Sequence, residues 1–152
     1  MRRFILIALP LAMTAVACNN GGSSTTPTTS ASPTLTTEVF TGTVPPPVNG
    51  ALQSVFNNFT VGQGGGQISV TLTSAVETLP GGNLLTTVTM GLGVGTPSGT
   101  ACAIINNGST ITQGGSAAQL AGSLSAGPYC VQVSDVTSQL GPVAYAVAVV
   151  HP

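Results

Sequence analysis

The sequence predicts an all-β protein, an antiparallel β-sandwich or jelly roll of seven to eight short strands, preceded by a signal peptide and a disordered linker. Three observations predict this fold. Apolar and polar residues alternate in several short segments after residue 38, turn signals rich in Gly and Pro separate these segments, and the chain shows no amphipathic pattern of helix length. Residues 38–152 have the usual size of one domain, so we expect a single β-sandwich domain with a modest core.

Four segments carry the strand pattern. Residues 67–74 (QISVTLTS), 84–94 and 129–135 (YCVQVSD) each place aliphatic or aromatic side chains on one face of a strand. Residues 144–150 (AYAVAVV) are apolar on both faces, which predicts a central strand. The inward side chains are expected to be Ile68, Val70 and Leu72; Leu84, Val88, Met90, Leu92 and Val94; Tyr129, Val131 and Val133; and Tyr145, Val147 and Val149, with Gln132 and Ser134 outward.

Clusters of Gly, Pro, Asn and Ser lie between these segments. Such clusters supply the positive φ angles and the side-chain bonds that turns require. We therefore expect turns at GQGGGQ (62–67), LPGGN (79–83), GTPSGT (95–100), NNGS (106–109) and SAGPY (125–129).

The amino terminus has the pattern of an export signal over residues 1–17. Arg2 and Arg3 precede an apolar run over residues 4–17, which is too short to span a bilayer and is typical of a secretory signal. Small residues at 15–17 lead directly to Cys18. This arrangement resembles the lipobox of bacterial lipoproteins, which implies that Cys18 is lipidated, with palmitate among its acyl chains. The alternative is an ordinary signal peptide that leaves Cys18 as an exposed and reactive thiol.

The resemblance to lipoproteins implies a membrane anchor at Cys18 in the bacterial cell envelope. Asn19 follows the cysteine where inner-membrane retention typically uses aspartate, which favours the outer membrane. Residues 18–37 are rich in Ser, Thr and Pro, so they are expected to form a disordered tether.

Charge is scarce after the signal peptide. Arg2 and Arg3 are the only Lys or Arg residues, and the acidic residues are Glu38, Glu77 and Asp135. Nucleic-acid binding depends on cations that neutralise phosphates, so nucleic acid is excluded as a partner.

Cys102 and Cys130 lie in segments expected to be strands. Two cysteines of an exported domain are expected to form a disulfide, whereas two buried thiols would be the alternative.

Five segments together resemble the bacterial pre-peptidase C-terminal (PPC) domain. They are VFTGTV, FNNFTVGQGGGQISVTLTS, ACAII, LAGSLSAGPYCVQVSDV and VAYAVAVVHP. The resemblance implies a β-sandwich of a kind found behind secreted peptidases and alone in envelope proteins. Members of that family that bind calcium use clustered acidic residues near the start of the domain, where this chain offers only Glu38.

No motif for catalysis, a metal or a cofactor stands out. The only histidine, His151, is next to the last residue and is expected to be exposed, and the three acidic residues lie in separate segments. We expect Asp135 to stabilise a turn and Glu77 to cap a loop that follows it. GQGGG and GLGVG fit neither phosphate-binding glycine motif.

The sequence therefore predicts a non-enzymatic envelope lipoprotein without cofactor or metal. Its domain would be a binding or structural module whose partner is an envelope protein or glycan. The alternative is a β-rich surface or fibre component that associates with itself through strand edges poor in charge. The ligand-binding residues and the oligomeric state are left open.

The lipidation of Cys18 is directly testable. Radiolabelled palmitate should enter the parent protein and should be lost in Cys18→Ala, because the acyl group is carried by that cysteine. A processed chain that begins at any residue other than Cys18 would contradict this prediction.

Overall fold

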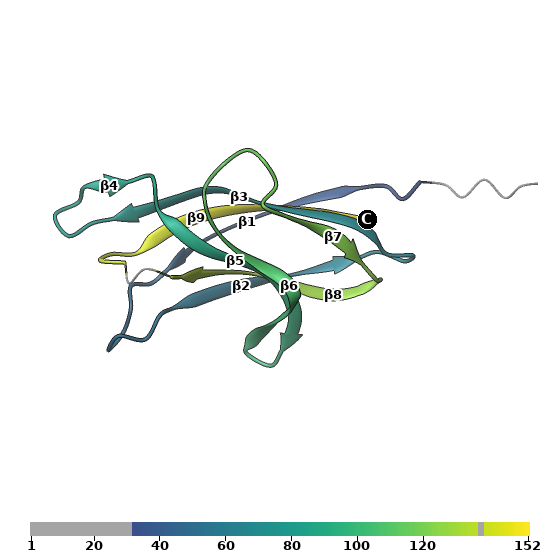
Figure 1. Cartoon of the computed structure of the whole chain (residues 1–152), viewed down its shortest axis with the longest axis horizontal. Helices are drawn as coiled ribbons and strands as arrows, with labels where there is room; N and C mark the ends of the chain where they lie inside the picture. The colour runs from purple at the N-terminus through teal and green to yellow at the C-terminus, as the bar shows by residue number, and fades with distance from the viewer. Residues whose placement is uncertain (1–31, 137–138) are drawn as a thin grey trace, which may run out of the picture. The chain divides into compact units, whose positions relative to one another are not determined.

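The computed structural model describes residues 32–136 and 139–152. They form nine strands in two antiparallel sheets that pack as a sandwich, which confirms the predicted all-β class (Figure 1). The signal peptide, Cys18 and most of the predicted tether lie outside these residues. The strands are β1 (Thr36–Val44), β2 (Ser54–Val61), β3 (Gly66–Thr78), β4 (Leu84–Leu85), β5 (Thr89–Ser98), β6 (Ala101–Gln113), β7 (Leu120–Leu124), β8 (Gly127–Asp135) and β9 (Val143–His151).

The first sheet is built around β9. Its strand order is β1-β9-β3, and the far side of β3 pairs with β7 near one end and with β4 at the other. Val147 of β9 lies opposite both Phe40 of β1 and Leu72 of β3. The central position predicted for this segment is confirmed, because a strand with two paired neighbours can place apolar side chains on both faces.

The second sheet has the order β2-β8-β5-β6, and Figure 1 shows it as the layer facing the first sheet. The sandwich core lies between the two layers and consists of the inward faces of their strands. Tyr145 reaches across this core, where its hydroxyl accepts a hydrogen bond from Asn57 Nδ2 at 3.0 Å. The buried apolar side chains include Val44, Phe59, Val61, Ile68, Val70, Leu72, Val88, Met90, Leu92, Val94, Val131, Val133, Val143, Tyr145, Val147 and Val149.

The prediction of one strand over residues 84–94 is wrong in its first part. Leu84 is 67% exposed, whereas Met90 is fully buried. Leu84 and Leu85 pair with Thr78 and Glu77 in the first sheet, but β5 belongs to the second sheet. The chain crosses between the sheets within this segment, so the alternation that sequence suggests does not continue through it.

The NNGS turn predicted at 106–109 is also wrong. These residues lie within β6, where residues 105–108 bulge out opposite Val94 alone. Asn107 has a φ of 58°, a left-handed conformation that Asn tolerates better than most residues. Asn and Gly favour a turn-like backbone here, but the flanking segments pair with β5 on both sides of the bulge rather than with each other.

The predicted disulfide joins Cys102 of β6 to Cys130 of β8, with their Cα atoms 5.9 Å apart. The two strands flank β5, where a Cβ added at Gly95 would lie 2.9 Å from Cys102 Sγ. The same Cβ would collide with the backbone carbonyl group of Ala103, so only glycine fits beside β6 and the disulfide at this position. Because disulfides persist in oxidising compartments, the bond indicates an extracytoplasmic location.

Removing the disulfide should lower the free energy of unfolding. In Cys102→Ala/Cys130→Ala, closure of this loop no longer restricts the unfolded chain, so we expect a loss of about 3.5 kcal/mol. Urea unfolding with and without reducing agent measures it. Reducing agent should destabilise the parent protein and leave the double variant unchanged; equal stability of the two proteins would refute the prediction.

Candidate ligand-binding groove

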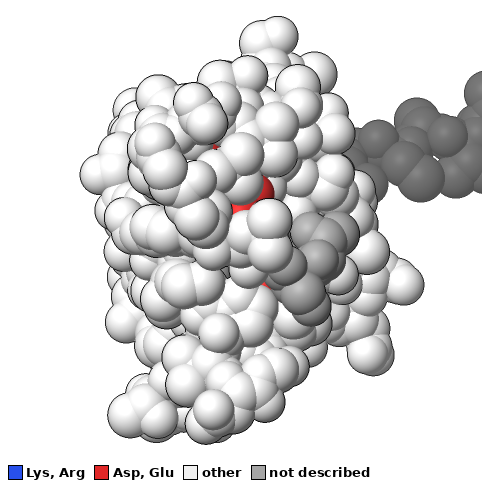
Figure 2. All heavy atoms as spheres, turned by 90° about the vertical axis from the view of Figure 1, so that its left-hand side faces the viewer, with Lys and Arg blue, Asp and Glu red and all other residues white. Residues whose placement is uncertain are grey.

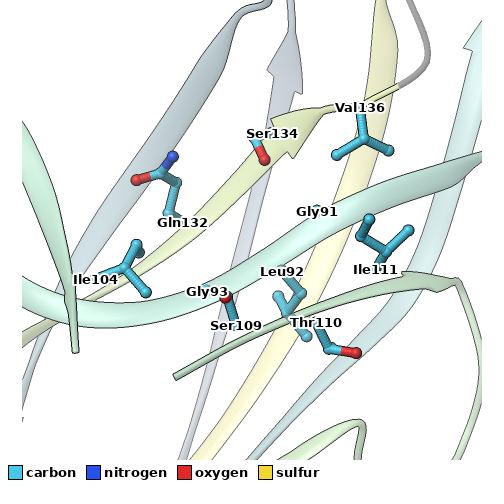
Figure 3. A pocket seen from close by; sticks show the side chains of 10 residues that line it. All are labelled: Gly91, Leu92, Gly93, Ile104, Ser109, Thr110, Ile111, Gln132, Ser134 and Val136. Atoms are coloured by element: carbon cyan, nitrogen blue, oxygen red, sulfur yellow. The ribbon is translucent and has the colours of Figure 1, made fainter. Parts of the chain in front are cut away.

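The outer face of the second sheet is hollowed over β5. The hollow has a volume of about 320 Å³, and residues of β5, β6 and β8 line it (Figure 3). Its floor contains Gly91 and Gly93, which alternate with the buried core residues Leu92 and Val94. Because successive residues of a strand face opposite sides, these glycines leave backbone where the outer face would otherwise carry side chains. We call this hollow the β5 groove.

The walls of the β5 groove combine aliphatic and uncharged polar groups. Gln132 and Ser134 of β8 line it, and both face outward as predicted. Figure 3 shows Ile104 and Ile111 of β6 toward opposite ends of the groove. Ile111 is 67% exposed, so this apolar side chain is available to a partner.

Glycine is what keeps the β5 groove open. A Cβ added at Gly93 would lie 2.7 Å from the δ-methyl carbon of Ile104, and one at Gly91 would collide with Ser134 Oγ. Any larger residue would therefore fill the groove or push its walls apart. The signal that could have located the groove from sequence is GLGVG, where glycine occupies alternate positions of a strand and so the same face.

The described residues that line the β5 groove include no ionisable side chain. Their polar groups are the Gln132 amide and the hydroxyls of Ser109, Thr110 and Ser134. Figure 2 shows a similar lack of charge on another face of the molecule, where acidic atoms emerge only in small areas and no basic ones are seen. Such a surface can hold an uncharged ligand by hydrogen bonds and close packing.

A second hollow of about 240 Å³ lies where the β6 bulge meets β7. Its lining includes Ile105, Asn107 and Leu124, together with the core side chains Ile68 and Val94. It is smaller than the β5 groove and lies between the β6 bulge and β7.

His151 is buried, which corrects the expectation of an exposed terminal side chain. It is only 4% exposed, and its Nε2 lies 2.8 Å from Glu38 Oε1. Its ring packs against Phe59 with the centroids 5.3 Å apart. The inward alternation of β9 continues to its last residue, and antiparallel pairing of β1 with β9 brings Glu38 alongside. The contact between His151 and Glu38 therefore links β9 to β1 through their side chains.

Glu77 and Asp135 both bind the backbone of the connection between β8 and β9. Glu77 Oε1 accepts hydrogen bonds from the N–H groups of Leu140 at 2.6 Å and of Gly141 at 2.9 Å. Asp135 Oδ2 accepts one from the N–H of Gln139 at 3.3 Å, as expected for a carboxylate that stabilises a nearby turn. The expectation for Glu77 needs correction, because it holds a loop distant in sequence rather than the loop that follows it.

The structure does not gather the ionisable residues into one site. Within residues 32–136 and 139–152, no group of three or more His, Cys, Asp and Glu side chains could hold a metal ion. The same part of the chain contains no helix long and apolar enough to cross a membrane.

Loss of the Glu77 carboxylate should destabilise the fold. Glu77→Ala leaves two backbone N–H groups without their acceptor, and an unsatisfied buried group costs about 1–3 kcal/mol. We expect urea unfolding to report a loss of about 2–4 kcal/mol. The matched variant Glu77→Gln keeps an acceptor oxygen of similar reach and should lose less. Equal stability of Glu77→Ala and the parent protein would rule out this role.

Comparisons of the chain with protein-family models, with curated proteins and with solved structures found no match.

Proposed function

We propose that this chain is a cell-envelope lipoprotein whose β-sandwich is a non-catalytic binding module on a flexible tether, with the β5 groove as its binding surface. The observation that carries the proposal is the pair of outward glycines, Gly91 and Gly93. Glycine inside a strand costs about 0.5–1 kcal/mol relative to alanine, and it is typical of places where a ligand approaches the backbone closely.

The lining of the groove supports an uncharged, extended protein segment as the ligand. A neutral surface leaves hydrogen bonding and packing to provide the affinity. The exposed Ile111 and the side chain of Ile104, which lies over Gly93, suit an aliphatic side chain of the ligand. None of the described residues that line the groove is aromatic, so they provide no flat apolar platform of the kind that supports a sugar ring.

Anchoring through Cys18 rests on the sequence motif that precedes it. The disulfide supports export, because such a bond persists outside the cytoplasm. The proposed location is the outer membrane, with the module displayed on a tether that ends before β1, because Thr36 and Thr37 of the predicted tether pair with β9. The motifs in residues 59–72 and 124–149 further support a place for the sandwich among PPC-like domains.

The hydrogen bonds of the ionisable side chains support the proposal of a non-catalytic module. Glu77 and Asp135 accept hydrogen bonds from backbone N–H groups, and His151 lies against Glu38. Each of these side chains therefore has a structural partner, whereas acid or base catalysis would require one of them to face a substrate.

A second candidate is a β-rich surface or fibre component that associates with itself. The observation that favours it is the number of large apolar side chains exposed on a surface with little charge. They include Val39, Leu52, Leu84, Ile111 and Leu140.

Filling the β5 groove should weaken ligand binding. The parent protein, labelled with ¹⁵N, is titrated with a panel of uncharged pentapeptides that carry one central aliphatic residue. We expect amide shifts at Gly91, Gly93 and Gln132, and an affinity about tenfold lower in Gly93→Val, because the added methyl groups occupy the floor of the groove.

Gly122→Val is the matched control. A Cβ at Gly122 of β7 meets nothing within 4 Å, so this variant should bind like the parent. Shifts that map elsewhere, or equal binding by Gly93→Val, would reject the groove as the site. Binding of neutral oligosaccharides without any peptide binding would reject the ligand class.

A further inference from the structure

The sandwich has four lateral edges, and they differ in how they are protected. An edge strand presents unpaired N–H and C=O groups that can pair with another chain, so proteins usually blunt such edges with charge, proline, bulges or short strands. The edges here are β1 and the far side of β3 in the first sheet, and β2 and β6 in the second.

Both edges of the first sheet are blunted. The edge strand β1 carries Glu38, and the chain beyond it continues into Pro45, Pro46 and Pro47. The far side of β3 is covered by the short strands β7 and β4. Between β7 and β4, the Gln119 side chain binds the backbone of Leu72. Its carboxamide oxygen accepts a hydrogen bond from Leu72 N at 2.7 Å, and its Nε2 donates one to Leu72 O at 3.4 Å, as a neighbouring strand would.

The β6 edge of the second sheet is blunted by its bulge. Residues 105–108 leave the ladder, and Asn107 adopts a positive φ. A bulge bends the strand and increases its twist, which divides this long edge into two short stretches.

The β2 edge has none of these devices. Its eight residues, SVFNNFTV, include no charged residue, no Gly and no Pro. These residues pair with β8 over the full length of the strand without a shift of register. In the part of the chain that the structure describes, β2 has no other strand partner. It is a regularly paired, uncharged edge composed largely of β-branched and aromatic residues, which favour strands.

We propose that β2 is the docking strand for a second copy of this chain, and that the two β2 strands pair antiparallel to form a continuous eight-stranded sheet. A two-fold axis perpendicular to the sheet generates this arrangement, as in isologous dimers. The occupant is a second copy because the segment is self-complementary. Pairing centred on Asn58 places Asn58 opposite its own counterpart, Phe56 opposite Thr60, and Val55 opposite Val61.

The two asparagines of β2 have different environments. Asn57 points inward and donates to the Tyr145 hydroxyl, so its amide already has a partner within the sandwich. Asn58 is exposed on the outer face. Side chains directly opposite each other in an antiparallel pair lie within contact distance, so the two Asn58 amides can bond to each other across the axis.

This pairing stops at two copies. An isologous contact uses the β2 edge of both copies, and the remaining edges are blunted, so the proposal predicts a closed dimer rather than a fibre. The axis also keeps the outer faces of both sheets on the same side. The two β5 grooves would therefore face the same direction, which allows a ligand with repeated segments to bind both at once.

Cysteine cross-linking in the intact envelope tests the contact with the full, anchored protein. Asn58→Cys should give a disulfide-linked dimer on a non-reducing gel, because directly opposed residues have Cα atoms about 4.5–5.5 Å apart, within the range of a disulfide. Ala144→Cys is the matched control, since Ala144 is exposed but lies on the central strand β9. Equal cross-linking at the two positions, or none at position 58, would overturn the proposal.

Charge substitution provides the second arm. Differently tagged copies of the parent protein should co-purify from detergent-solubilised envelopes, and co-purification should fall about fivefold when both carry Asn58→Lys, because like charges then lie opposite each other. Pairing an Asn58→Lys copy with an Asn58→Glu copy should restore it, which a folding defect could not do. No loss with two lysines, or no recovery with the mixed pair, would exclude this interface. Asn58 does not line the β5 groove, so a loss at this position and its recovery by opposite charges report the β2 contact, whether or not the proposed binding function holds.

Discussion

The pairing of β9 with both β1 and β3 is the interaction on which the rest of the structure depends. One face of β9 supplies Val143, Tyr145, Val147 and Val149 to the core, and its last residue, His151, holds Glu38 of the first strand. The connection that leads into β9 is in turn bound by Glu77 of β3. Since the last strand lies between the first strand and the third, the first sheet can be completed only when the whole domain is present.

The scarcity of charged residues determines which groups make the polar contacts of the domain and which groups cover its surface. The acidic side chains and the single histidine bind backbone groups or each other. The neutral side chains of Tyr145 and Gln119 accept hydrogen bonds from Asn57 and from the backbone of Leu72. The surface is left to hydroxyls, amides and aliphatic groups. With so few charges, this surface provides little long-range electrostatic attraction.

The second sheet combines the features that bear on function. Its middle strand β5 carries outward glycines beneath a neutral groove, the disulfide ties the strands on either side of β5 together, and its far edge β2 remains unprotected. The disulfide and the buried face of β5 hold the groove floor in place. If the proposed ligand binds there, a groove floor held in this way would limit the conformational entropy lost on binding.

The sequence by itself determined the all-β class, the inward faces of β3 and β9, the central place of β9 and the pairing of Cys102 with Cys130. These features follow from alternation and composition, which act between close neighbours in the chain. Only the tertiary structure decided that Leu84 belongs to a different sheet from Met90 and that NNGS is a bulge. It also decided that Glu77 and His151 are buried and that glycines of GLGVG form the floor of a groove. Each of these depends on which distant segment lies alongside, and no local pattern specifies that neighbour.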